Sequence, residues 1–365
     1  MVFDDSGLKE LYGRYGYKQF RMSKFEEYEL YIKNRDFLDS LNVITFTDTN
    51  GKLMALKPDV TLSIVKNSKD TPGEVRKVFY NENVYRVSKN TGSFQELMQI
   101  GLECVGDVDE YNIYEVLMLA AKSLYEISVD SLLDISHLGI INSVVDMCNM
   151  DYDARKEILN YISNKNNQGI VRACRNRGID EDKIEILSKI CQTYGKPDKV
   201  ISVLEECLIE GEAVAALGQL KRVLRAFDDS PIKDILRIDF SVTDDIGYYN
   251  GIVFKGFIND VPDKVLSGGQ YDKVLEQMGL KSKAIGFAIY TNVLDRLSKK
   301  ESVYDVDTLI IYDEGEDIGQ IGALVKKMSA DGSSVVAQRK VPERLRAGQV
   351  IRLYEGKVEV VESND

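Results

Sequence analysis

Residues 94–104 read FQELMQIGLEC, which predicts a strand with one apolar face and one polar face. Side chains alternate across a strand, so the face that points into a core carries Met98, Ile100, Leu102 and Cys104. The opposite face carries Gln95, Gln99, Gly101 and Glu103. Because glycine has no side chain, Gly101 leaves a gap where a ligand can approach the backbone between Gln99 and Glu103. The stretch predicts a carboxamide and a carboxylate that face one cleft, although a sheet face open to solvent is the commoner cause of such a pattern.

Two further segments carry side chains of matching chemistry. The motif GYYNG places Tyr248 and Tyr249 between glycines, and PDVTLSIVKNS places Asp59 and Thr61 in the first turn of a predicted helix. Carboxylates together with a tyrosine suit a ligand that has an ammonium group and an aromatic ring with an N–H group. An amino acid of the histidine type fits this description. Asp59 equally fits the plain role of a residue that starts a helix.

The N-terminal half predicts antiparallel sheet. Asn50 and Gly51 join two short apolar runs, and this dipeptide is the strongest short signal of a β-hairpin. Residues 75–87 and 94–105 predict two longer strands, and residues 110–127 predict a helix. An α+β fold follows from this order of elements.

Changes of composition along the chain predict three parts. Residues 1–138 and 229–302 mix strand and helix signals and are expected to form one domain. Residues 139–228 contain helical runs with few strand signals, which indicates a helical insertion. Residues 303–365 predict a small C-terminal α/β unit.

Composition narrows the class of protein. The chain has 365 residues, 44% of them hydrophobic and 29% charged, which is typical of a globular protein without a membrane span. A net charge of −12 argues against a nucleic-acid partner, because binding phosphates needs a basic surface. The N-terminus has no secretory pattern, and the 5 cysteines are scattered without pairs. We therefore expect reduced thiols and a cytoplasmic location.

The chain has 1 histidine, His137. This excludes metal centres and catalytic sites that need two histidines. The simplest role for His137 is a hydrogen-bonded residue where a strand turns into a helix. We expect neither a metal site nor a cofactor.

The quoted segments resemble the class II histidyl-tRNA synthetases when they are taken in order along the chain. The likeness runs through YGRYGYKQFRMSKFEEYELY, FTDTNGKLMALKPDVTLSIVKN, VYRVSKNTGSFQELMQIGLECVG, GYYNGIVF, SGGQYD and AIGFAI, and covers most of residues 8–300. It implies a class II synthetase-like antiparallel sheet of six or seven strands with flanking helices. It also implies a homodimer formed through the N-terminal segment.

The resemblance assigns the polar residues to a histidine-binding site. In that family the amino group of histidine is held by residues that correspond to Asp59, Thr61 and Gln99. The imidazole ring is held by residues that correspond to Glu103 and Tyr249, with Tyr248 adjacent. The half of the site that binds the amino acid is therefore expected to be present.

The residues that a synthetase uses to bind ATP and catalyse the reaction are expected to be missing. Synthetases need guanidinium groups where charge develops on the ATP phosphates. The positions of three such arginines correspond to Asp244, Gln270 and Val293, while Arg86 corresponds to the arginine of motif 2. A negative charge at Asp244 opposes phosphate binding, and the loss of several contacts at a few kcal/mol each implies no catalytic residues and no synthetase activity.

A chain that keeps the residues for the amino acid and lacks the arginines for ATP resembles the regulatory subunits of ATP phosphoribosyltransferase. These subunits are a synthetase-derived family of histidine biosynthesis. The resemblance implies a non-catalytic partner of the short-form catalytic subunit, a glycosyltransferase, in a hetero-oligomer. It also implies feedback regulation by L-histidine as an allosteric ligand. Two alternatives stay open: a divergent histidyl-tRNA synthetase, and a free-standing histidine-binding signalling module.

Overall fold

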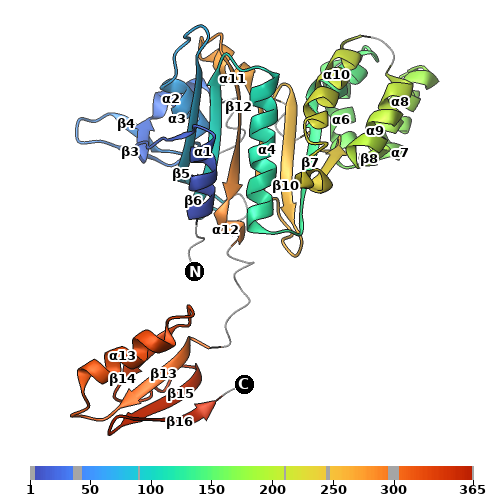
Figure 1. Cartoon of the computed structure of the whole chain (residues 1–365). Coiled ribbons are helices and arrows are strands. Elements are labelled where there is room, and N and C mark those ends of the chain that lie inside the picture. The colour runs from blue at the N-terminus through green and yellow to red at the C-terminus, as the bar shows by residue number, and fades with distance from the viewer. Residues whose placement is uncertain are drawn as a thin grey trace. The chain divides into compact units, whose positions relative to one another are not determined.

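The computed structural model forms two compact units, Met1–Arg296 and Leu297–Asp365 (Figure 1). It describes residues 5–35, 43–88, 91–208, 211–243, 247–294 and 304–363. Among the described helices, none has the length and apolar character to cross a membrane.

A sheet of 9 strands organises the first unit. In spatial order its strands are β1 (Lys18–Gln19), β5 (Val75–Val87), β6 (Phe94–Gly106), β12 (Lys283–Tyr290), β11 (Leu266–Gln270), β10 (Ile252–Ile258), β7 (Ser131–His137), β9 (Leu236–Asp239) and β8 (Tyr194–Gly195). Neighbouring strands are antiparallel except for β1 with β5 and β7 with β9. The predicted class is confirmed, whereas the expected six or seven strands were too few. Very short strands at both edges add to the count, and two-residue strands lack a periodic signal.

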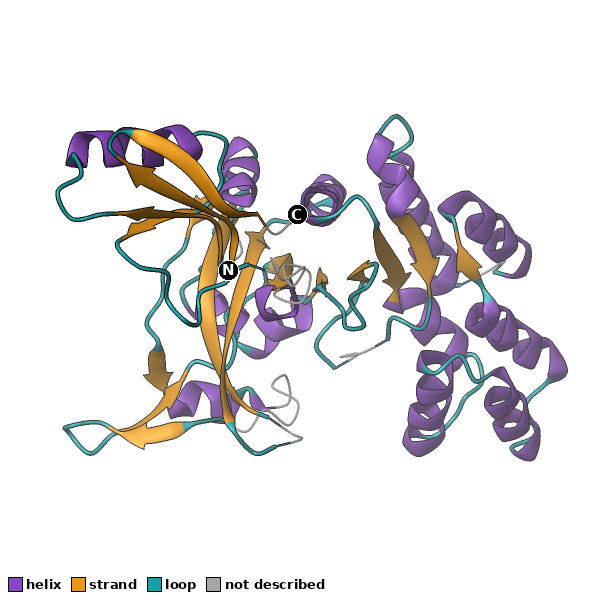
Figure 2. Ribbon diagram, turned by 90° about the horizontal axis from the view of Figure 1, so that it is seen from below, coloured by secondary structure: helices purple, strands orange, loops and turns teal. Residues whose placement is uncertain are grey.

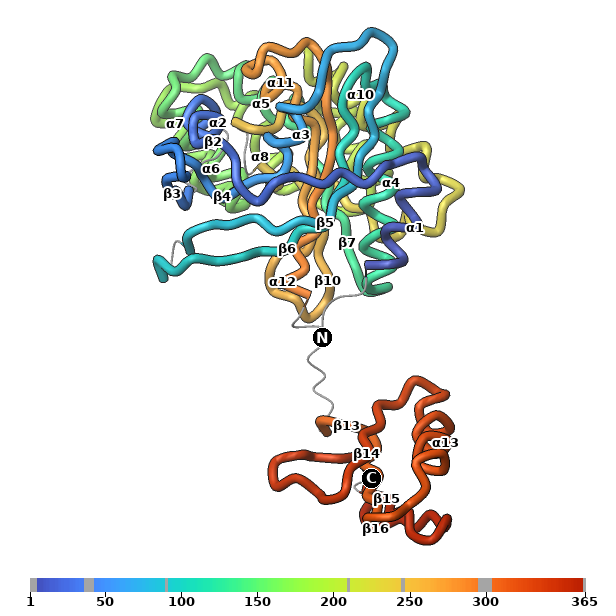
Figure 3. Tube along the Cα trace, turned by 90° about the vertical axis from the view of Figure 1, so that its left-hand side faces the viewer, coloured from blue at the N-terminus to red at the C-terminus, as the bar shows by residue number. Residues whose placement is uncertain are grey.

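Different elements cover the two faces of this sheet (Figure 3). Helices α1 (Ser6–Arg14) and α4 (Glu110–Ile127) lie on one face. A small sheet lies on the other, with strand order β2 (Phe25–Glu27), β4 (Leu53–Leu56), β3 (Thr45–Thr47). Helices α2 (Tyr28–Lys33), α3 (Thr61–Lys66) and α11 (Asp272–Gln277) share the core on that second face. The hairpin predicted from Asn50 and Gly51 is confirmed, since β3 and β4 pair in antiparallel register around it.

The alternation predicted for residues 94–104 is confirmed in β6. Cys104 is fully buried beside Tyr17 and Glu115 on the α4 face. Glu103 points to the other face, where it contacts α3 and the end of β11. Successive residues of β6 thus serve the core on one face and a polar site on the other.

The chain between β7 and β9 is almost wholly helical, and these helices gather at the end of the sheet that contains β7, β9 and β8 (Figures 1 and 2). They are α5 (Leu138–Asp146), α6 (Tyr152–Ser163), α7 (Asn167–Asn176), α8 (Glu181–Gln192), α9 (Pro197–Cys207), α10 (Glu212–Arg225) and the 3₁₀ helix η2 (Pro231–Ile235). Arg222 of α10 forms a two-pronged ion pair with Glu110 of α4, which ties the helices to the sheet. That this segment is an insertion in a domain made of residues 1–138 and 229–302 stays a prediction.

His137 lies where β7 ends and α5 begins, as predicted. Its Nδ1 accepts a hydrogen bond from the backbone N–H of Gly139 at 3.1 Å, and its Nε2 lies 2.8 Å from Oε1 of Gln219. Burial lowers the pKa of His137, so the neutral ring that accepts this cap bond is favoured.

The second unit contains β13 (Val306–Tyr312), α13 (Ile318–Met328), β14 (Val335–Gln338), β15 (Ala347–Tyr354) and β16 (Lys357–Ser363). Its sheet has the order β14-β13-β15-β16, with parallel pairing except between β15 and β16. Ile310, Ile351 and Leu353 pack under α13, while Leu309 and Val350 belong to a second cluster. The predicted start of this unit, residue 303, lies outside the described residues.

Candidate ligand-binding site

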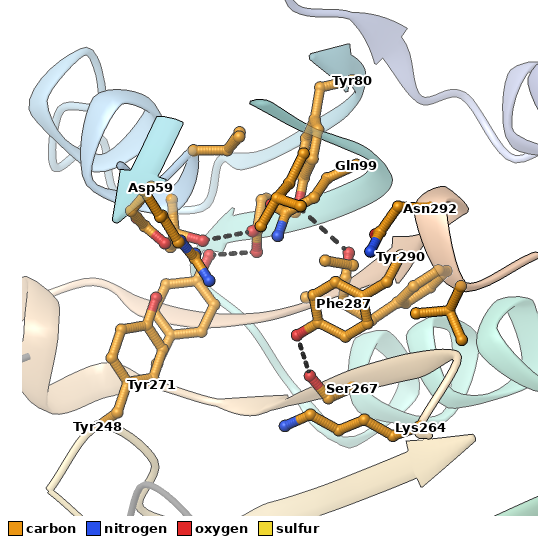
Figure 4. A pocket seen from close by; sticks show the side chains of 18 of the residues that line it. Asp59, Tyr80, Gln99, Tyr248, Lys264, Ser267, Tyr271, Phe287, Tyr290 and Asn292 are labelled. Atoms are coloured by element: carbon orange, nitrogen blue, oxygen red, sulfur yellow. Dashed lines mark hydrogen bonds between the residues drawn. The ribbon is translucent and has the colours of Figure 1, made fainter. Parts of the chain in front are cut away.

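The first unit holds a pocket of about 520 Å³ over the sheet (Figure 4). Its walls come from the start of α3, from β5, β6, β11 and β12, from the turn before β10, and from α12 (Thr291–Leu294). All 6 residues predicted from the sequence line it: Asp59, Thr61, Gln99, Glu103, Tyr248 and Tyr249. Residues that lie up to 190 positions apart in the sequence, Asp59 and Tyr249, therefore share one cavity.

Glu103 is the most buried carboxylate of the pocket, with 2% of its surface exposed. Its Oε1 accepts a hydrogen bond from the hydroxyl group of Thr61 at 2.8 Å, and its Oε2 accepts one from the hydroxyl group of Tyr271 at 2.6 Å. Burial raises the pKa of Glu103 to about 8, although both hydroxyl groups oppose this shift. The two hydrogen bonds hold the carboxylate in one orientation. They do not fully offset the cost of burying its negative charge.

Asp59 combines the two roles that its sequence position allowed. Its Oδ1 accepts a hydrogen bond from the backbone N–H of Leu62 at 2.9 Å, at the start of α3, and its side chain lines the pocket. Burial raises the pKa of Asp59, while the Leu62 bond and the charge of Arg86 oppose the shift. Two carboxyl groups that both resist ionisation form a site that a cationic ligand would stabilise.

Gln99 is a buried polar side chain in the pocket wall. It is 4% exposed and lines the pocket, and among the described residues none forms a hydrogen bond with its carboxamide group. The carboxamide lines the pocket, so it can form hydrogen bonds with a ligand or with ordered water there.

Aromatic rings close the acidic end of the pocket. The ring centres of Tyr248 and Tyr249 are 4.8 Å apart in an edge-on arrangement, and those of Tyr248 and Tyr271 are 5.8 Å apart. Burial raises the pKa of Tyr248 and of Tyr271 well above the usual range, so both remain neutral hydroxyl groups that can donate hydrogen bonds.

Sequence reasoning missed Tyr271 and Tyr80 as members of this site. Tyr271 stands in the SGGQYD motif, where only the glutamine was considered. Tyr80 fills the space that was expected to admit a ligand: a Cβ atom on Gly101 would lie 2.6 Å from the Tyr80 hydroxyl oxygen. The role predicted for Gly101 is therefore wrong, because the missing side chain makes room for a tyrosine of β5. Gln95 is exposed and does not line the pocket.

The positions of the absent arginines have different surroundings. Asp244 lies outside the described residues. Val293 lines the pocket, as predicted. Gln270 does not: its Oε1 accepts a hydrogen bond from the backbone N–H of Ile252 at 2.8 Å and so joins β11 to the start of β10. Arg86 lines the pocket, and its Nε donates to the backbone oxygen of Pro58 at 2.8 Å.

No group of three or more acidic, cysteine or histidine side chains in the described part of the chain is placed to hold a metal ion. Carboxylates, neutral tyrosines and a carboxamide can instead bind a ligand with several N–H groups. The arrangement supports binding through hydrogen bonds and charge.

Known proteins share this sequence pattern and fold. The sequence profile of the histidyl-tRNA synthetase family matches residues 5–294. An ATP phosphoribosyltransferase regulatory subunit from Bacillus cereus (strain AH187) is 25% identical over 340 residues, which cover 90% of this chain and 80% of the relative.

Two solved structures have a similar fold. An ATP phosphoribosyltransferase regulatory subunit/histidyl-tRNA synthetase from Bacillus halodurans is 21% identical with a TM-score of 0.71, over 91% of this chain and 86% of the other. A chain of an ATP phosphoribosyltransferase complex from Thermotoga maritima is 20% identical with a TM-score of 0.62, over 80% of this chain and 98% of the other. The predicted likeness to these regulatory subunits and the predicted class II synthetase-like fold are confirmed.

Proposed function

The chain belongs to the histidyl-tRNA synthetase family, and on that premise we propose that it is a non-catalytic regulatory subunit of ATP phosphoribosyltransferase that binds L-histidine. In this role it is required by the short-form catalytic subunit in the first step of histidine biosynthesis, and it transmits feedback inhibition by histidine. The observation that supports this ligand is the buried carboxylate of Glu103 in the same pocket as the carboxamide of Gln99.

The chemistry of the acidic end supports an amino acid with an N–H-bearing ring. Asp59 and Glu103 are poorly compensated for negative charge, and the ammonium group and ring N–H of histidine would supply that compensation. Gln99 offers a carboxamide oxygen to the ammonium group. Tyr248 and Tyr249 offer aromatic surface to the ring.

The small number of arginines among the described lining residues supports a site that binds the amino acid without forming an adenylate. Among the described lining residues there is one arginine, Arg86, and its Nε is already bonded to a backbone oxygen. A synthetase aims several guanidinium groups at the phosphates, each worth a few kcal/mol in the transition state. The chain can then act only through another subunit whose state depends on histidine binding.

The partner and setting of this role rest on similarity. The Bacillus cereus relative is named a regulatory subunit of ATP phosphoribosyltransferase. The Thermotoga maritima structure is that of an ATP phosphoribosyltransferase complex. We propose that the chain forms a homodimer within a hetero-oligomer with the short-form catalytic subunit. The five cysteines, none of which forms a disulfide, support a cytoplasmic setting.

Calorimetric titration with L-histidine tests the ligand. Gln99→Ala should reduce affinity by about tenfold with little loss of stability, because no protein hydrogen bond is lost. Glu103→Ala should reduce it by more than tenfold. Glu96→Ala on the same strand is the control, since Glu96 is exposed and outside the pocket. Unchanged affinity in both pocket variants would refute a histidine site.

Sedimentation with a short-form catalytic subunit tests the partner. We expect a complex at micromolar concentrations and an activity that depends on it. Histidine binding without any complex would instead support the free-standing signalling module. Histidine-dependent exchange between ATP and pyrophosphate would support the divergent synthetase.

A further inference from the structure

The pocket has two chemically different ends. The acidic end holds Asp59 and Glu103 with the tyrosines described above. The other end is formed by the segment that enters β11 and by the end of β12, which contribute Lys264, Ser267 and Tyr290. Figure 4 shows these two sets of side chains on opposite sides of the pocket. A ligand that bridges them meets carboxylates on one side and an amine on the other.

Lys264 is a half-buried cation of this second end. Its Nζ lies 5.9 Å from the ring centre of Tyr290, and no ion pair joins it to another described residue. The hydroxyl oxygens of Tyr290 and Ser267 are 2.6 Å apart, and this hydrogen bond holds the ring under the lysine. In Figure 4 the Lys264 amine points toward the side of the pocket where Tyr248 lies. A partly buried lysine amine in a pocket wall can form a charge-assisted hydrogen bond with an anionic group of a ligand.

Arg86 is the other cation among the described lining residues, and it is less available to an anionic group of a ligand. Its Nε donates to the backbone oxygen of Pro58, and its charge already offsets the burial of Asp59. Asp263, the acidic neighbour of Lys264, is exposed and has an interaction of its own. Of the two cations among the described lining residues, Lys264 is therefore the one with fewer interactions inside the protein.

We propose that Lys264 binds the carboxylate of the amino acid whose ammonium group lies at the acidic end. The proposal rests on the proposed function, because it assigns a contact to the same ligand. The amino acid is then held at three points: its amine near Asp59 and Gln99, its ring near Glu103, and its carboxylate at Lys264.

Two ligands that differ only in the carboxylate test this contact. L-histidine and L-histidinol, which carries a hydroxymethyl group instead, are titrated into the wild type and into Lys264→Met. We expect Lys264→Met to lose on the order of tenfold or more in affinity for L-histidine and less than about twofold for L-histidinol. Lys264→Arg should retain most of the discrimination between the two ligands.

The matched control is Lys283→Met, because Lys283 is exposed at the start of β12 and does not line the pocket. It should bind both ligands as the wild type does, and thermal unfolding checks that each variant is folded. An equal loss for the two ligands, or no loss, would overturn the role of Lys264 and leave the histidine site intact. A wild type that binds neither ligand would overturn the proposed function as well.

Discussion

Gly286 of β12 lies directly across from Glu103 of β6, and a Cβ atom at Gly286 would overlap with Oε2 of the Glu103 carboxylate. The missing side chain thus makes room for the carboxylate that Thr61 and Tyr271 hold in place. Glycine at this position is a requirement of the pocket, because the overlap involves a side chain with both oxygens already bonded.

Gly286→Ala should therefore displace the Glu103 carboxylate from its two hydroxyl partners. We expect affinity for L-histidine to fall by about tenfold or more, with a loss of stability of roughly 1–3 kcal/mol from overpacking. Calorimetry and urea unfolding measure the two effects. Gly13→Ala in α1 is the control, because nothing lies within 4 Å of an added Cβ atom there. Wild-type affinity in Gly286→Ala would show that the position of Glu103 does not matter for binding.

The raised pKa of Glu103 predicts a pH dependence of stability. Its pKa is about 8 in the folded chain against 4.5 as its ordinary value, so the folded state binds the proton more tightly. This contribution is fully present below pH 4.5 and is lost as the pH rises through 8. The side chain in Glu103→Gln cannot ionise, so this variant should lack the pH-dependent contribution to stability.

Urea unfolding of the ligand-free wild type and of Glu103→Gln at pH 5.5 and 8.5 measures this effect. The wild type should lose about 3 kcal/mol relative to the variant over that interval, at about 1.4 kcal/mol per pKa unit. A difference between the two proteins that is the same at both pH values would contradict a raised pKa.

Tyr271→Phe should shift this pH dependence upward. The Tyr271 hydroxyl group donates to Oε2 of Glu103 and favours the ionised form, so its removal raises the pKa of Glu103 further. The loss of stability should then continue to a higher pH than in the wild type, while its onset near the ordinary pKa of a glutamate stays the same. Tyr125→Phe is the control, since Tyr125 is 47% exposed on α4. A downward shift or none would mean that the hydroxyl group does not act on Glu103.

The ion pair of Lys57 and Glu82 supports the wall of β5. Lys57 is fully buried, and its Nζ lies 2.8 Å from Oε2 of Glu82. Glu82→Gln leaves this lysine buried without a counter-charge and should cost about 3–5 kcal/mol, whereas Lys57→Met leaves only the partly exposed Glu82 and should cost less. Urea unfolding at neutral pH compares them. A larger loss for Lys57→Met would contradict the importance of the buried charge.

The local features of this site could be predicted from the sequence. Side-chain alternation places Gln99 and Glu103 on one face of a strand, and a Pro-Asp pair places Asp59 and Thr61 at the start of a helix. Such patterns depend on backbone geometry over a few residues, so they hold wherever the strand or helix forms. Short edge strands have no comparable signal, which is why the sheet is wider than expected.

The partners of these residues were decided only by the tertiary structure. Thr61 and Tyr271, which bond to Glu103, lie 42 and 168 positions from it in the chain. The same holds for Tyr80, which fills the gap at Gly101, and for Gln270, which binds backbone and not a ligand. The sequence by itself determined which side chains share one face of a strand or the first turn of a helix. Packing of distant segments decided which of them are already bonded and how far burial raises their pKa values, because contact and desolvation depend on neighbours that no local pattern specifies.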